Sequence, residues 1–204
     1  MAKPLVRVYT DYKSPYAFIA NKRLFELEDT HGVELEWLPY TLRVAEFMGT
    51  VEERTPHFWR KVRYAYMDAR RFANAQGLVM KGPRRIYDAF HSSVGMLFAQ
   101  RHGFFRPYHD TVFRMFWSHE LEIDDLAAIA DVITSCGGSA SAFEAYVNGP
   151  ARAEHETMIW THPGMSTYYR NTSGRVFSAM PWRFVDYWRM THDPDLGQYR
   201  LTKA

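Results

Sequence analysis

Hydrophobic and polar positions recur with different periods along the first forty residues. Residues 5–10 are mostly apolar, and Ala20, Leu24 and Leu27 then recur at helical spacing. In residues 33–37, apolar side chains alternate with glutamates. A period of two is typical of a strand with one buried face, and a period near 3.6 is typical of an amphipathic helix. The beginning of the chain therefore predicts a strand, a helix and a second strand.

The far end of the chain also predicts strands. Residues 166–169 and 176–177 are β-like and flank the sequence Asn-Thr-Ser-Gly at 171–174, which suits a hairpin turn. Pro181 then favours the first turn of an aromatic-rich helix that continues to about Met190, since proline is accepted at the first helical position. We therefore expect two strands followed by a helix.

Helical patterns fill the middle of the chain. Thr55 before Pro56, and Ser141 three residues before Glu144, have the composition of helix starts, because their hydroxyls accept hydrogen bonds from backbone N–H groups. Glycines placed where a helix could end are Gly77, Gly103, Gly137, Gly138 and Gly149.

Together these units predict an α/β fold in which both ends of the chain build one four-stranded mixed sheet. The arrangement is thioredoxin-like, with a large helical insertion. We place the thioredoxin-like domain at residues 1–50 and 162–204, and the inserted helical domain at residues 51–161.

Composition narrows the class of protein. Of 204 residues, 47% are hydrophobic and 16% aromatic, which suffices for one substantial core or two small ones. No apolar stretch approaches the roughly 20 residues that span a bilayer, and residues 1–4 lead into a strand without a signal-peptide pattern. The lone Cys136 excludes an internal disulfide or a Cys-x-x-Cys pair. We expect a cytoplasmic protein with no membrane partner.

Charge is distributed unevenly although the net charge is only +2. Residues 54–85 contain nine Lys or Arg and one acid, Asp68, whereas residues 120–131 contain five acids and no Lys or Arg. We expect the two segments to neutralise each other in part across the fold. A near-neutral chain without a nucleic-acid-binding motif argues against a nucleic-acid partner. A small anionic or aromatic molecule suits the basic segment better.

The tetrapeptide at 14–17, Ser-Pro-Tyr-Ala, lies between the first predicted strand and its helix. The simplest interpretation is structural, with Ser14 as the helix cap and Pro15 at the first helical position. The start of a helix also has outward-pointing N–H groups and about half a positive charge, so it can hold an anion such as a thiolate.

A set of motifs points to a family. They are residues 11–17, 61–64 and 68–73, Gly77-Leu78 with Pro83, and the helical run 95–116. In this combination the chain resembles, over nearly its whole length, the DsbA-like group that contains 2-hydroxychromene-2-carboxylate isomerase and kappa-class glutathione transferases. Redox members carry Cys-Pro-x-Cys where this chain has Ser14 and Ala17 at the cysteine positions. The resemblance therefore implies glutathione chemistry without disulfide exchange.

The resemblance also implies roles for single residues. In the family, the serine at the position of Ser14 hydrogen-bonds the glutathione sulfur and holds it as a thiolate, so Ser14 is the expected catalytic residue. Pro15, Tyr16, Met165 and Ser166 are the expected glutathione-binding residues.

Lys61 and Arg71 are our candidates for holding a substrate carboxylate or a developing enolate, since cations stabilise such charge. A solvated helix face is the alternative for both. The expected activity is a glutathione-dependent isomerisation of an aromatic or polyketide-like carboxylate, in which the thiolate adds reversibly to an electron-poor carbon. A homodimer is expected by analogy with isomerase relatives.

The sequence departs from the family pattern at two places. Ser166 stands where relatives have a proline, which is usually cis, and residues 178–183 lack the acid that contacts the glutathione amino group. These departures motivate a second hypothesis, a catalytically inactive or glutathione-independent thioredoxin-fold protein that binds a ligand or acts as a scaffold.

Metal and cysteine chemistry are not indicated. The nine histidines lack the spacing of a helical zinc site, so no metal is expected. Cys136 is expected at a helix C-terminus, where the negative end of the helix dipole disfavours a thiolate.

Overall fold

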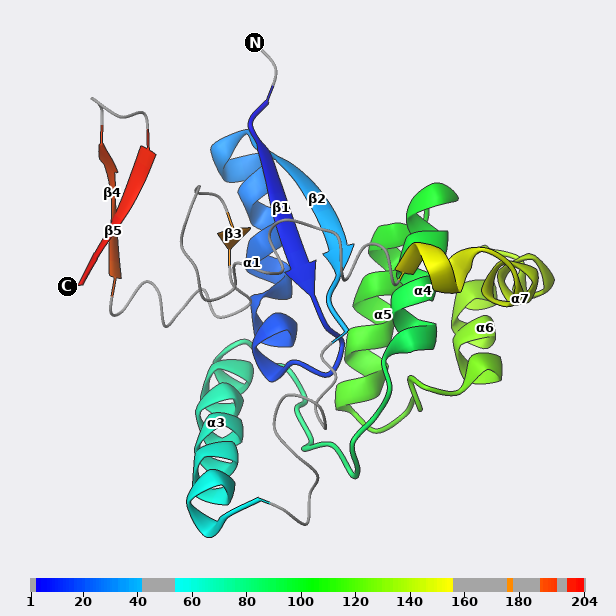
Figure 1. The fold of residues 1–204 in the computed structure, drawn as a ribbon, viewed down its shortest axis with the longest axis horizontal. Helices are drawn as coiled ribbons and strands as arrows, with labels where there is room; N and C mark the ends of the chain where they lie inside the picture. Colours follow the sequence, from blue (N-terminus) through cyan, green and yellow to red (C-terminus); the bar gives the residue numbers. More distant parts are fainter. Residues whose placement is uncertain (1–2, 42–53, 156–175, 178–187, 194–197, 204) are drawn as a thin grey trace.

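The first three elements form the unit that the hydrophobic pattern predicts. A computed structural model describes residues 3–41, 54–155, 176–177, 188–193 and 198–203 (Figure 1). It begins with β1 (Leu5–Thr10), α1 (Pro15–His31) and β2 (Glu34–Pro39). β1 and β2 pair in parallel, from Leu5 opposite Glu34 to Thr10 opposite Pro39. A parallel pair needs a crossover connection, and α1 provides it.

Helices α3 to α7 lie between β2 and the next described strand, β3 (Val176–Phe177). They are α3 (Pro56–Ala75), α4 (Phe90–Arg101), α5 (Phe105–Trp117), α6 (Leu126–Ser135) and α7 (Ala140–Asn148). In Figure 1, α4 to α7 gather on one side of the strands, and α3 stands apart from them beside the beginning of α1. This order agrees with a large helical insertion, while the division into two domains stays a prediction.

The described strands form a thioredoxin-like α/β arrangement, but not the complete sheet that the sequence predicts. The sheet has the order β2-β1-β3, and β3 pairs in parallel with β1. The expected strand at 166–169 lies outside the described residues. The four-stranded mixed sheet therefore stays a prediction.

The expected helix from Pro181 to about Met190 is wrong at its end. Residues 181–187 lie outside the described ones, and Trp188 begins a strand, β4 (Trp188–Asp193). β4 pairs antiparallel with β5 (Gln198–Lys203), with Trp188 opposite Lys203. The strand at 188–190 depends on pairing with β5, which the local pattern of apolar residues does not contain.

Side-chain caps mark the beginnings of α1, α3, α6 and α7. Thr55 accepts a hydrogen bond from the Phe58 N–H at 3.2 Å, as its place before Pro56 predicts. The start expected at Ser141 is wrong by two residues, because the Ser139 hydroxyl caps α7 by accepting from the Ala142 N–H at 3.3 Å. α1 ends at Gly32, whose φ of 60° lies in the left-handed region that favours glycine.

Helix α1 belongs to two hydrophobic cores. Its first part packs into a large cluster with α3 to α7, through Tyr16, Phe18 and Ile19. Its second part, with Leu24 and Phe25, packs on the strands in a smaller cluster. The start of α1 is therefore held between the strands and the helical insertion.

The acidic and basic segments meet as the charge pattern predicts. The Arg85 guanidinium binds the carboxylates of Glu122 and Asp124, at 2.9 and 2.5 Å. Arg85 thereby lowers the pKa of Asp124. None of the helices in the described ranges is long and apolar enough to cross a bilayer.

The contact between α4 and α5 has no room for a side chain at Gly95. A Cβ there would overlap the Tyr108 hydroxyl, which is fixed because it donates to the Ser92 carbonyl at 2.8 Å. We expect Gly95→Ala to lower the free energy of unfolding by about 1–3 kcal/mol, measured by urea denaturation. The control is Gly82→Ala, where an added Cβ meets nothing within 4 Å. Equal stability of both variants would contradict this account of the packing.

Candidate active site at the start of helix α1

Ser14 is the N-cap of α1, directly after the loop that follows β1. Its Oγ accepts a hydrogen bond from the Ala17 N–H at 3.2 Å, and Pro15 occupies the first helical position. A hydroxyl can accept and donate at the same time, and no described residue accepts the Ser14 O–H. α1 also has no acidic residue in its first turn. The geometry thus leaves an O–H donor at the positive end of a helix dipole.

The loop before Ser14 is held by its own polar groups. The Ser14 N–H donates to the Asp11 carbonyl at 2.9 Å, and the Lys13 N–H donates to Asp11 Oδ1 at 2.9 Å. The Lys13 ammonium lies 3.6 Å from the other oxygen of this buried carboxylate. The positive charge of Lys13 offsets the negative charge of the Asp11 carboxylate, so the loop does not repel an anion at Ser14.

Tyr16 connects the start of α1 to α3. Its side chain is buried, and its hydroxyl donates to the Ala65 carbonyl at 3.3 Å. Gln76 Nε2 makes a second link by donating to the Ile19 carbonyl at 3.1 Å. Tyr16 therefore links α1 to α3, a structural role that is additional to its expected role in glutathione binding.

Lys61 and Arg71 are both exposed on α3, and the structure does not bring them to one point. Ten residues on an α-helix span about 15 Å. From Ala65, which faces α1, Lys61 is rotated by only about 40° around the helix and Arg71 by about 120°. By this rotation Lys61 lies nearer than Arg71 to the side of α3 that carries Ala65, and the expected roles of both stay predictions. Met165 and Ser166 lie outside the described residues, so their expected roles stay predictions.

Two residues of α3 near this site were not predicted as functional. Asp68 is buried, and its Oδ2 has no hydrogen-bond partner among the described residues. Tyr66 is close enough to Asp11 and Arg54 to sense their charges, and burial raises the pKa of its hydroxyl to about 12. Asp68 was visible in the sequence as the single acid of a basic segment, whereas the burial of Tyr66 depends on how α3 packs.

His109 of α5 anchors the loop from behind. Its Nδ1 is 2.8 Å from the Tyr12 hydroxyl, and both side chains are buried. Aromatic rings surround the imidazole, with centroids at 4.8 to 6.0 Å, and they belong to Tyr12, Phe25, Trp37, Phe105 and Phe113. Burial, assisted by the nearby Arg106, lowers the pKa of His109 to about 3. The ring is therefore neutral at physiological pH.

Residues 5–157 match the family model described as the DSBA-like thioredoxin domain. The chain belongs to this family. The match includes β1, Ser14 and helices α3 to α7. It confirms the resemblance inferred from the sequence.

The relatives of this DSBA-like chain include the isomerases that its motifs resemble. It is 26% identical to the 2-hydroxychromene-2-carboxylate isomerase of Pseudomonas putida over 151 residues, 74% of each chain. A stretch of 55 residues is 46% identical to an uncharacterised monooxygenase, y4iD, of Sinorhizobium fredii. The stretch is 27% of this chain but only 8% of that protein.

Solved structures support the same fold. A 2-hydroxychromene-2-carboxylate isomerase structure superposes with a TM-score of 0.63 at 23% identity, covering 86% of both chains. A cytosolic disulfide reductase, DsbM of Pseudomonas aeruginosa, solved with GSH, superposes with a TM-score of 0.55 at 14% identity, covering 80% of this chain and 82% of the other.

Neutral, buried His109 makes stability depend on pH. Its pKa is about 3 in the folded protein and near 6.5 in the unfolded chain, so the unfolded chain binds more protons between these values. Stability is present above pH 6.5 and falls as the pH is lowered, by about 2 kcal/mol at pH 5. We expect His109→Gln, which can still accept from Tyr12, to reduce this loss in denaturation at pH 7.5 and 5.

A matched control is His57→Gln on the exposed start of α3. It should retain the loss between the two pH values. If His109→Gln retained the same loss, the imidazole would not be the group responsible.

Proposed function

We propose that this protein is a glutathione-dependent isomerase that acts on an aromatic or polyketide-like carboxylate. The observation that carries the proposal is Ser14 at the start of α1, with a hydroxyl that no described residue uses as a donor. A hydroxyl donor and a helix N-terminus both favour a thiolate over a thiol. Isomerase relatives that cover about three quarters of the chain support the reaction class.

The absence of a cysteine at positions 14 and 17 directs the thiolate to addition instead of disulfide exchange. The glutathione thiolate forms a C–S bond to an electron-poor carbon of a conjugated double bond, and the electron pair moves onto the conjugated carbonyl as an enolate. The former double bond can then rotate. Expulsion of the thiolate re-forms it, so no electrons are gained or lost. Lys61 is our candidate to stabilise the enolate or a substrate carboxylate, with Arg71 as the more distant cation.

Residues 178–183 lack the acid that contacts the glutathione amino group in relatives, and Asp68 offers a carboxylate in its place. Its buried Oδ2 has no partner among the described residues, and such a group costs stability unless a ligand or water completes its hydrogen bonds. Asp68 follows Lys61 by two helical turns and is rotated from it by only about 20°. We propose that Asp68 binds the ammonium of glutathione, on the side of α3 that also carries Lys61.

We propose that the protein works in the cytoplasm as a homodimer on a small anionic or aromatic substrate, without a nucleic-acid or membrane partner. The lone Cys136, which caps the end of α6, suits a reducing compartment.

Loss of the Ser14 hydroxyl should weaken the binding of reduced glutathione. A hydrogen bond to a charged group contributes about 1.5–3 kcal/mol, so Ser14→Ala should raise the Kd by roughly 10- to 100-fold. Calorimetric titration at pH 7 in two buffers of different ionisation enthalpy measures both the affinity and the proton released by the wild-type protein.

Ser139→Ala is the matched control, because Ser139 caps α7 as Ser14 caps α1. It should lose a comparable cap but bind glutathione like the wild type. Equal affinity of the Ser14→Ala variant would remove the proposed thiolate site. Absence of binding at several millimolar glutathione would favour the glutathione-independent ligand-binding protein instead.

Asp68→Asn tests the second contact, since it preserves size but removes the charge. We expect about tenfold weaker binding of glutathione in the same titration, the scale of one charge-assisted hydrogen bond. N-acetylglutathione, which lacks the ammonium, should bind the wild type and the variant equally. A similar loss for both ligands would show that Asp68 acts on the fold and not on the ammonium.

A further inference from the structure

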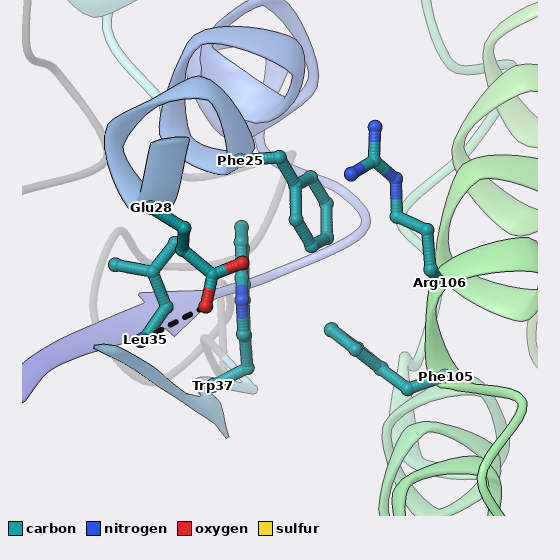
Figure 2. Close-up of a pocket in the computed structure, with 6 residues that line it drawn as sticks. All are labelled: Phe25, Glu28, Leu35, Trp37, Phe105 and Arg106. Atoms are coloured by element: carbon teal, nitrogen blue, oxygen red, sulfur yellow. Dashed lines mark hydrogen bonds between the residues drawn. The ribbon is translucent and has the colours of Figure 1, made fainter. Parts of the chain in front are cut away.

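A pocket of about 270 Å³ lies well away from Ser14, and the proposed reaction does not use it. It is formed by the second half of α1, by β2 and by the start of α5 (Figure 2). The lining residues are Phe25, Glu28, Leu35, Trp37, Phe105 and Arg106. Phe25 follows Ser14 by eleven residues of a helix, which corresponds to about 16 Å. A ligand here would therefore not contact a sulfur at Ser14.

Three aromatic rings form the walls of this pocket. The rings of Phe25 and Trp37 stack with centroids 4.7 Å apart, and Phe105 lies 5.6 Å from Trp37 and 6.0 Å from Phe25. His109 packs behind them, 4.9 Å from Trp37. Because the rings are held from behind, the pocket exists before a ligand arrives. Phe25 and Trp37 are nearly buried and face each other, so a flat aromatic molecule can contact Phe105 and the small exposed parts of the other two rings.

A cation lies on the α5 side of the pocket. The Arg106 guanidinium lies 3.6 Å from the centre of the Phe25 ring, and its Nε donates to Asp110 Oδ2 at 2.7 Å. Asp110 is in turn fixed by Asn21 Nδ2 at 2.7 Å. The two terminal nitrogens of Arg106 make no hydrogen bond to any residue in the described ranges. They form a positioned fork that can bind a carboxylate through two hydrogen bonds.

An anion lies on the α1 side. One oxygen of Glu28 accepts from the Leu35 N–H at 3.2 Å, which fixes the carboxylate beside the pocket (Figure 2). Glu28 repels a second negative charge and accepts hydrogen bonds from hydroxyl or amino groups. The pocket therefore presents aromatic walls between one cationic and one anionic group.

We propose that this pocket binds a planar aromatic carboxylate whose ring carries a hydroxyl or amino group. The ring lies against Phe105 and the small exposed part of Trp37, the carboxylate binds Arg106, and the ring substituent donates to Glu28. This site needs neither glutathione nor Ser14, and so it is separate from the proposed active site.

The experiment is a calorimetric titration of the full chain with 4-hydroxybenzoate, with benzoate and cyclohexanecarboxylate as comparison ligands. We expect saturable binding of 4-hydroxybenzoate and at least tenfold weaker binding of cyclohexanecarboxylate, which cannot stack. Arg106→Gln should weaken 4-hydroxybenzoate at least tenfold. Glu28→Gln should weaken 4-hydroxybenzoate more than benzoate. Arg114→Gln, an exposed arginine of the same helix paired with Glu120, is the control and should bind like the wild type.

The same titration with Ser14→Ala, and with several millimolar glutathione present, separates the two sites. Unchanged 4-hydroxybenzoate affinity in both supports a separate pocket, even if glutathione itself does not bind. Binding that is lost with Ser14→Ala or competed by glutathione would place the ligand at the active site and overturn the pocket proposal. Absence of saturable binding at millimolar ligand, or equal affinity of the Arg106→Gln variant, would also overturn it.

Discussion

The hydrogen bond between Tyr12 and His109 joins the two parts of the molecule on which the site depends. Tyr12 belongs to the loop that presents Ser14, and His109 belongs to α5 of the helical insertion. The pair is buried among aromatic rings, so an unmade hydrogen bond would leave polar atoms without water. The loop therefore has one favourable position relative to the insertion. Asn21, nine residues after Tyr12 and within α1, makes a second link to α5 by donating to Asp110.

The beginning of the chain could be predicted from sequence because its signals are local. The strands, the Ser14 cap and Pro15 at the first helical position follow from periodicity and from short-range hydrogen bonds. Thr55 was predicted for the same reason. The segment at 188–190 was predicted wrongly because pairing with β5, which a local pattern does not contain, decides its structure.

The rest of the candidate site depends on contacts between distant residues. His109 lies 97 positions from Tyr12. Its spacing from Val112 and Phe113 is that of one apolar helix face, but nothing near it in the sequence indicates which residue it bonds. Asp68 is buried and Tyr66 is partly buried because α3 packs on α1, which places Ala65 against Tyr16. Lys61 and Arg71 looked equivalent as neighbours in a basic segment, and only the helix geometry separates them. The number of charged residues can be read from the sequence, but the direction in which each charged side chain faces cannot.

Helix α1 explains how one small protein could hold two independent binding sites. Its dipole acts mainly within the first turn, so an anion at Ser14 benefits from it, whereas Glu28 and the aromatic pocket are too distant to be affected. The second site must supply its own positive charge, and Arg106 from α5 does so. His109 packs on the pocket walls and bonds the loop of Ser14, so the two sites share one rigid support. A neutral, buried His109 does not change charge near pH 7. It therefore fixes the positions of the loop and of the pocket walls but adds no charge to either site.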